Sequence, residues 1–458
     1  MNTKTKFKGL YRTCIQPMAF QQGELTNANN SPDAEPLPRT HPAESPLQPL
    51  EFDVSQSPEL GEISSTQPGR LNMNELRLLQ HFLLNTAKRM SLNPERGIVW
   101  QRVIPELASK NEFLMHLMLS LAGVHMLSES QSRNHTDIIS DADSNVDAGA
   151  NDLETPTLID LNIVIEHHQK GLRMFQEVLS TVSAATAEAV SCGSFLLVAF
   201  AFASLHLRDP EKSFTPATQS LNTGRPRLDW LHLVRGLTIV TGQHWHTLRR
   251  SRLRALLYYR YRNDDWKLHP RLSTPSLPRL KHCSPRLKRF AHGAYEAISN
   301  LRILTSNTTS IATPTSTHSS CSFLSEKQDE HAQTIDIMEE MYMRILHVLH
   351  FPGGEQDASA ALDIEADIED AAIISWPHLV PGGFIYTLEL NEGLGVAEGV
   401  SYTILAHFYL IIVLFENTWF LKGGFEKEIS KINTLVGSLG DSQLGLLMRW
   451  PVEVIALE

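Results

Sequence analysis

The chain has 458 residues, 42% of them hydrophobic, which is enough for one large domain or two ordinary ones with a sizeable core. Its formal net charge of -11 argues against binding of polyanions by the whole surface, while a local basic surface remains compatible with it. Four widely spaced cysteines without a C-x-x-C pair argue against a disulfide scaffold and a cysteine zinc site, so we expect free thiols in a reducing compartment.

Residues 1–70 are predicted to form a disordered arm. The segment from about Gln21 to Arg70 is rich in Pro, Ser, Asn, Gln and acidic residues, and it buries too little apolar area to offset the entropy of ordering. A helical domain is predicted from Leu71 onward, and Asn72 suits the N-terminal cap of its first helix. The apolar stripe expected on this helix consists of Leu76, Leu79, Leu83, Ala87 and Met90.

The rest of the domain is predicted to be all-α, because no run shows the strict alternation of a half-buried strand. Amphipathic helices are indicated at 229–240, with Asp229 as its cap, and at 335–348. Their expected buried residues are Trp230, Leu233, Val234, Leu237 and Val240, and Ile335, Met338, Met341, Tyr342, Ile345 and Val348. Polar segments at about 128–158 and 305–328 are predicted to be insertions in a single large helical domain over residues 71–458.

Two windows are strongly apolar, FLLVAFAFASL from Phe195 and YTILAHFYLIIVLF from Tyr402. Each is shorter than the run of about 20 apolar residues that a membrane-spanning helix needs. We therefore expect buried core helices and no membrane segment. A secretory signal is not visible either, because the N-terminal residues lack a continuous apolar run.

The stretch His246–Phe290 is densely basic. Its arginines and lysines suit a nuclear import signal or phosphate contacts, and solvated helix faces are the alternative. The residues that we select as the candidate basic patch are Arg249, Arg250, Arg252, Arg254, Lys288 and Arg289. A second charged stretch, GGEQDASAALDIEADIED from Gly353, alternates acidic and apolar residues. It fits either an activation-type peptide or an exposed amphipathic helix or loop.

Neither a metal site nor a catalytic centre is predicted. His244 with His246, and Glu166 with His167 and His168, are too close in sequence, because neighbours on a helix point about 100° apart and cannot converge on one ion. A G-x-S-x-G elbow, a P-loop and a dinucleotide-binding turn are all missing from the sequence. An enzyme with a site assembled from scattered residues is therefore kept only as a second alternative.

A series of motifs follows in a fixed order along the chain. The motifs are LLQHF, VWQRVIPELA, FLMHLMLSLAGVHM, HHQKGLRMF, FLLVAFAFAS and HLVRGL, then WPHLVPGGFIYTLEL from Trp376, YTILAHFYLIIVLFENTWFLKGGF from Tyr402 and MRWPVEVIA from Met448. Their order and spacing resemble the regulatory domain of fungal binuclear zinc-cluster transcription factors, with the sterol-uptake-control-like group as the nearest. The resemblance covers most of residues 71–458 and implies an all-α regulatory domain.

The sequence departs from this family ahead of the domain. Members usually carry six cysteines that bind two zinc ions and read DNA, whereas the arm here holds one cysteine, Cys14. Two explanations stay open: the first exon is missing from this sequence, or the domain acts without its own DNA reader. We expect no cofactor in this chain, and zinc only if the missing cluster exists.

The turn NTWFLKGGF is the candidate ligand pocket, formed by Trp419, Phe420, Gly423, Gly424 and Phe425. The resemblance implies an apolar sterol pocket near a Gly-rich loop in this part of the chain. Paired glycines let backbone approach closely, and aromatic rings supply rigid walls. A helix cap with core aromatics is the alternative. A pocket predicts that Gly424→Asp alters regulation and spares the fold, whereas a structural glycine predicts unfolding.

The resemblance implies a nuclear fungal transcriptional regulator that acts through its helical domain. The expected partners are coregulators or a homo- or heterodimer partner, with an apolar metabolite such as a sterol as candidate ligand and DNA bound only through the missing module. The first alternative is an interaction protein that cannot bind DNA and modulates full-length zinc-cluster regulators. Target genes, ligand identity and the activating or repressing sign are not encoded in any motif.

Overall fold

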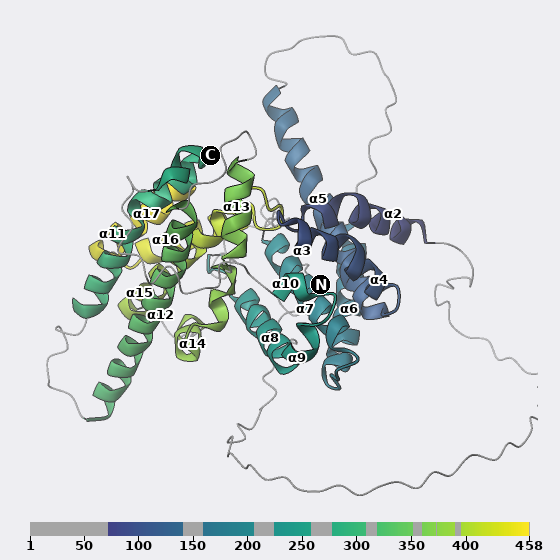
Figure 1. The fold of residues 1–458 in the computed structure, drawn as a ribbon. Coiled ribbons are helices and arrows are strands. Elements are labelled where there is room, and N and C mark those ends of the chain that lie inside the picture. The colour runs from purple at the N-terminus through teal and green to yellow at the C-terminus, as the bar shows by residue number, and fades with distance from the viewer. Residues whose placement is uncertain are drawn as a thin grey trace, which may run out of the picture. The chain divides into compact units, whose positions relative to one another are not determined.

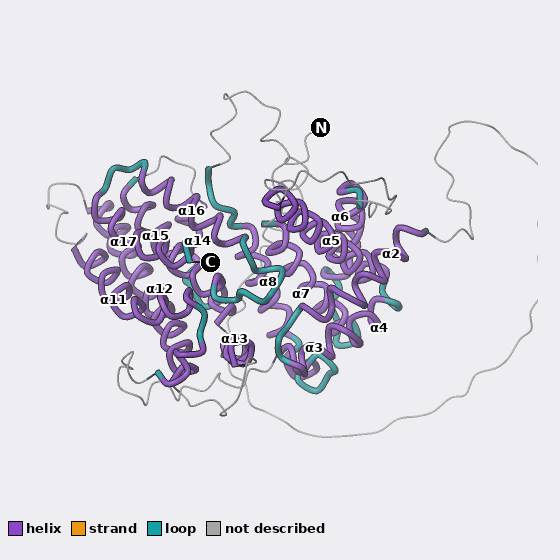
Figure 2. The backbone as a smooth tube through the Cα atoms, turned by 90° about the horizontal axis from the view of Figure 1, so that it is seen from above, coloured by secondary structure: helices purple, strands orange, loops and turns teal. Residues whose placement is uncertain are grey.

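A computed structural model of the chain describes residues 72–140, 159–205, 224–257, 277–307, 318–350, 360–371, 373–389 and 395–457. Every regular element in these ranges is a helix, which confirms the all-α fold class (Figures 1 and 2). The described residues from Asn74 onward belong to one compact unit. The predicted disordered arm, residues 1–70, lies outside the described residues.

The first half of the described chain builds the N-terminal core, defined here as the buried cluster from Leu78 to Leu257 together with Trp419. A long helix, α5, packs against α6 and α7 at its centre. The elements of this half are α2 (Met73–His81), η1 (Phe82–Thr86), η2 (Ala87–Arg89), α3 (Pro94–Ile98), η3 (Val99–Val103), α4 (Ile104–Ala108), α5 (Glu112–Ser140), α6 (Leu161–Leu179), α7 (Ala187–Ser204), α8 (Asp229–Gln243), α9 (Trp245–Leu248) and α10 (Arg254–Leu257).

The second half builds the C-terminal core, defined as the buried cluster from Ala201 to Val454. Helix α15 lies within it and packs against α16 and α17, while α11 packs against α12 and α17. The elements are η8 (Pro278–His282), α11 (Pro285–Asn307), α12 (His318–His350), α13 (Ala360–Asp370), η9 (Ile373–His378), α14 (Gly382–Glu389), α15 (Val396–Val413), α16 (Gly424–Gly437) and α17 (Ser442–Ile455).

Helix α12 shows how sequence pattern becomes packing. The six residues that were expected on its buried face are all at most 1% exposed: Ile335, Met338, Met341, Tyr342, Ile345 and Val348. The stripe predicted for the first helical segment is wrong at Leu76 and Leu83, which are 40% and 38% exposed, and right at Ala87 and Met90, which are buried. Leu78 and Phe82 are fully buried in place of the two exposed leucines. The segment changes from α-helix to π-helix at Phe82, so one α-helical spacing does not hold along its whole length.

Helix starts follow ordinary capping chemistry. The Asn93 side chain accepts hydrogen bonds from the backbone N–H groups of Glu95 and Arg96, and Pro94 occupies the first helical position of α3. Asp160 and Asp441 cap α6 and α17 in the same way. In α8 the predicted cap Asp229 is instead the first helical residue, because the helix begins one residue earlier than expected and Leu228 occupies the cap position.

The two strongly apolar windows lie in α7 and α15. Both helices are long and apolar enough to cross a membrane, but 83% of each 18-residue window is buried inside the protein. That burial agrees with the expected core helices. The edges of both predicted insertions are helical, because α5 continues to Ser140 and α12 begins at His318.

Candidate functional site

The candidate turn connects α15 to α16. Its backbone closes through hydrogen bonds from the N–H groups of Leu421 and Lys422 to the carbonyl of Thr418, at 3.0 and 3.2 Å. Gly423 then adopts φ 79° and precedes the first turn of α16. This left-handed conformation is strained for residues that carry a Cβ, so the chain needs a glycine at this position.

The aromatic side chains of the turn enter both cores. Trp419 is 5% exposed and packs into the N-terminal core, where its ring lies 4.1 Å from the His125 ring. Phe425 is fully buried in the C-terminal core, at 5.3 Å from Trp230 and 5.1 Å from Tyr409 between ring centroids. The turn therefore holds the two cores together through apolar contact.

The surroundings of Gly424 are closely packed. A Cβ added at this residue would lie 2.8 Å from the Cβ of Leu205, at the end of α7. Ordinary contacts at that position begin at 3.4 Å. The geometry favours the structural alternative for Gly424, and it indicates that Gly424→Asp disturbs packing rather than sparing the fold.

Helix α13 supplies a second connection to this turn. Glu365 accepts hydrogen bonds from the Asn417 N–H at 3.1 Å, the Asn417 Nδ2 at 2.8 Å and the Thr418 hydroxyl at 3.4 Å. Burial raises the pKa of Glu365 to about 7, against the opposing effect of these hydrogen bonds.

The other end of α13 forms ion pairs with the N-terminal helices. Arg96 lies 3.0 Å from a carboxylate oxygen of Glu369 and 2.7 Å from one of Asp370. Asn93 Nδ2 donates to Asp370 at 3.1 Å, and Ser91 donates to Glu369 at 2.7 Å. The side chains of Arg96 and Asp370 are each 5% exposed, so this is a buried polar junction.

This use of α13 decides between the two interpretations of the acidic stretch. Its apolar residues Ile364 and Ile368 are 2% and 1% exposed, while Leu362 is 44% exposed. Three of its carboxylates face arginines: Asp367 lies 2.6 Å from Arg279, and Glu369 and Asp370 pair with Arg96. Residues 360–370 of this stretch form an amphipathic helix docked on the domain. The second interpretation is therefore right about the helix and wrong about its exposure, because its apolar face is buried.

The candidate basic residues belong to two different elements. Arg249, Arg250, Arg252 and Arg254 follow one another between the end of α9 and the start of α10. Within this group Arg252 pairs with Glu106 at 2.8 Å and with Glu188 at 3.5 Å. The hydrogen bond that Arg252 donates to Glu106 is the main cause of the raised pKa of Arg252.

Lys288 and Arg289 lie on α11, whose neighbours Leu287 and Phe290 belong to the C-terminal core. Arg289 lies 3.8 Å from Glu453 of α17. The structure therefore divides the candidate basic patch between the two cores. In the first group Arg249 is half-buried, and Arg250, Arg252 and Arg254 are exposed.

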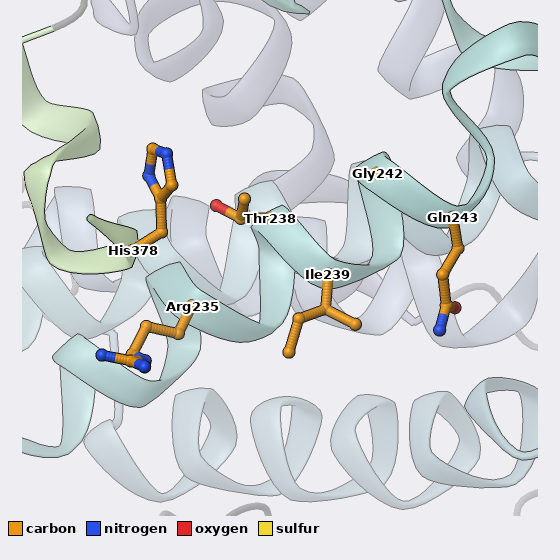
Figure 3. Close-up of a pocket in the computed structure, with 6 residues that line it drawn as sticks. All are labelled: Arg235, Thr238, Ile239, Gly242, Gln243 and His378. Atoms are coloured by element: carbon orange, nitrogen blue, oxygen red, sulfur yellow. The ribbon is translucent and has the colours of Figure 1, made fainter. Parts of the chain in front are cut away.

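A groove that the sequence did not indicate opens between α8 and η9 (Figure 3). It has a volume of about 380 Å³ and is lined by Arg235, Thr238, Ile239, Gly242, Gln243 and His378. Arg235 donates to the carbonyl of Val380 at 2.9 Å and so connects α8 to the segment after η9. The polar residues Thr238 and Gln243 interrupt the apolar pattern of α8, and this interruption was the only sign of the groove that the sequence offered.

The adjacent histidines of α6 diverge, as helical geometry requires. His167 Nδ1 lies 2.7 Å from His116 Nδ1, while the His168 ring stacks on Phe200 at 3.7 Å. Burial lowers the pKa of His168 to about 3, so this side chain is neutral. Neither the pair nor its neighbour Glu166 forms a common ligand set in the described residues.

Comparison with known proteins gives a family match for the first half of the chain. Residues 77–209 match the family described as fungal specific transcription factor domain. The matched residues of this domain run from α2 to just beyond α7, which are the helices that build most of the N-terminal core.

The chain is also similar to sterol uptake control protein 2 of Saccharomyces cerevisiae, with 24% identity over 194 residues. That match covers 41% of this chain and 17% of the yeast protein, so the chain spans a small part of its relative. These findings agree with the resemblance inferred from the motifs.

Proposed function

We propose that this chain is the regulatory domain of a fungal transcriptional regulator that works in the nucleus by binding coregulators or a dimer partner. The observation that carries the proposal is the match of residues 77–209 to the fungal specific transcription factor domain. The matched helices form a packed apolar core, which suits a binding function.

A finer part of the proposal is control by an apolar metabolite of the sterol class. It is supported by the name of the yeast relative, sterol uptake control protein 2. Movement of the turn that carries Trp419 and Phe425 would change the contact between the cores, because these side chains enter one core each. Such a turn offers a route from ligand to output.

The test is a tethering experiment in fungal cells. The full chain is fused to a heterologous DNA-binding domain, and transcription of a matching reporter is measured with and without added sterol. We expect the fusion to change the reporter at least several-fold relative to the DNA-binding domain alone. A well-expressed fusion with no effect on the reporter would overturn the proposal.

Nuclear import has its own test. The triple change Arg249→Ala, Arg250→Ala and Arg254→Ala should move a fluorescent fusion toward the cytoplasm. Arg252 is left intact, because its pairs with Glu106 and Glu188 give it a structural role. Changing Lys288 and Arg289 in a second fusion shows whether the group on α11 contributes.

A silent fusion has its own follow-up. Co-precipitation of the tagged chain with full-length zinc-cluster regulators, in cells where the tethered fusion is silent, would favour an interaction protein that modulates those regulators.

A further inference from the structure

Three side chains of metal-ligand type converge where α2 meets α5. His81 ends α2, and His125 and Glu129 lie one turn apart on α5. His81 Nε2 is 3.1 Å from His125 Nδ1 and 4.0 Å from a carboxylate oxygen of Glu129. One ligand atom from each of the three residues lies within 4.8 Å of the others.

These separations are close to those of a bound zinc ion. With zinc–nitrogen bonds of about 2.0–2.1 Å in a tetrahedral site, two ligand atoms lie roughly 3.3 Å apart. The two imidazole nitrogens already meet that distance. The Glu129 side chain is 30% exposed and has room to rotate, so its oxygen can close the remaining gap.

Neighbouring polar side chains form hydrogen bonds with the three residues in the metal-free structure. Asn85 Nδ2 lies 3.1 Å from His81 Nδ1, and the Thr86 hydroxyl lies 3.0 Å from His125 Nδ1. Arg89 competes for Glu129, because its guanidinium lies 3.0 Å from that carboxylate. It also lies 3.2 Å from His125 Nε2, whereas the His125 nitrogen closest to His81 is Nδ1. The Arg89 side chain is 51% exposed, so it can move into solvent.

We propose that His81, His125 and Glu129 form a regulatory site for zinc, in which the ion displaces the Arg89 guanidinium from Glu129. Two nitrogens and one carboxylate oxygen suit zinc, whereas calcium and magnesium prefer all-oxygen sites. The fourth position would face the solvent side now occupied by Arg89 and would hold water.

The site also has a connection to the turn between the two cores. His125 is 1% exposed, and its ring lies 4.1 Å from that of Trp419. Coordination would fix the orientation of the His125 ring and change the electronic surroundings of the indole. Zinc occupancy would therefore be sensed by Trp419, independently of any DNA reader or sterol.

The experiment titrates chelator-treated full-length protein with zinc chloride, followed by calorimetry and competition with a chromophoric chelator. We expect one ion per chain, with affinity at least tenfold weaker in His81→Ala and in Glu129→Gln. The matched control is His116→Gln, which alters the other buried histidine pair and should leave zinc affinity unchanged.

The variant Arg89→Gln tests whether the three residues form a metal site or only an internal hydrogen-bond cluster. Removing a cation about 3 Å from the ligands should tighten zinc binding several-fold, since it relieves repulsion and competition. Circular dichroism verifies that each variant is folded. Cobalt(II) in place of zinc should give the visible absorption of a four-coordinate site in wild type and in Arg89→Gln.

Tryptophan emission provides the last readout. Zinc should change emission in wild type and leave it unchanged in Trp419→Phe, although both bind the ion. Absence of stoichiometric binding, equal affinity in folded His81→Ala, or weaker binding in folded Arg89→Gln would each overturn the proposal.

Discussion

Replacement of Gly424 by alanine measures how tightly the inter-core turn is packed. The new Cβ would lie 2.8 Å from the Leu205 Cβ, where ordinary contact begins at 3.4 Å, so α7 or α16 must move by the 0.6 Å difference. The clash involves a Cβ on each side, so a rotamer change cannot relieve it. Overpacking of this kind costs about 1–3 kcal/mol, and a Gly→Ala change in a helix returns up to about 1 kcal/mol. We expect a net loss of about 1–2 kcal/mol in the free energy of unfolding.

Gly445→Ala in α17 is the matched control. Gly445 is exposed within its helix, and a Cβ there would meet nothing within 4 Å. This change should stabilise the protein by about 0.5–1 kcal/mol through helix propensity alone. Urea unfolding followed by circular dichroism compares both variants with wild type. If Gly424→Ala is as stable as Gly445→Ala, the turn is loosely packed and the pocket hypothesis regains support.

Three further predictions concern the polar junction, Glu365 and the two tryptophans of the C-terminal motifs. Arg96→Ala leaves Asp370 buried without its cation and should lower the free energy of unfolding by about 3–5 kcal/mol in urea titrations. Folding raises the pKa of Glu365 from 4.5 to about 7, so protonation of Glu365 stabilises the folded state fully below pH 4.5, and this contribution is lost as the pH rises through 7. Glu365→Gln should remove this pH dependence of the free energy of unfolding, which amounts to up to about 3 kcal/mol. An unchanged slope of stability against pH would contradict the assignment. Trp419→Ala should cost about 3–5 kcal/mol and Trp450→Ala less, because Trp450 is only partly buried; thermal melting ranks the two.

The fold was predictable where one face of a segment is clearly apolar. Helix α12 presents such a face, and every residue expected to be buried there is buried. Helix α15 was predictable for a different reason, because a fully apolar helix of this length must lie inside the protein or inside a membrane. The position of Leu446 four residues before Trp450 predicts that Trp450 is largely buried, but Leu446 is 70% exposed and Trp450 is only partly buried. The aromatic neighbours of Trp450 include Phe290 and Tyr342, which are distant in sequence.

The candidate site was predictable only in part. The sequence selected the Trp419 turn by its aromatic and glycine content, but the partner of Gly424 is Leu205, more than two hundred residues earlier. The contacts of Asn93 with Asp370 span 277 positions, and those of His81 with His125 span 44. Pairings of this kind depend on how helices pack in space, and a single sequence carries no periodic signal for them.

The placement of Trp419 in the N-terminal core has a consequence for the order of events on the ribosome. The family-matched segment ends at residue 209, and its core is completed by a side chain at position 419, which is 210 residues later. At a synthesis rate of about 5–20 residues per second, the early helices wait roughly 10–40 s for that side chain. During this interval the apolar surface that Trp419 will cover is open to chaperones, so we expect the nascent chain to need their protection until Trp419 has emerged.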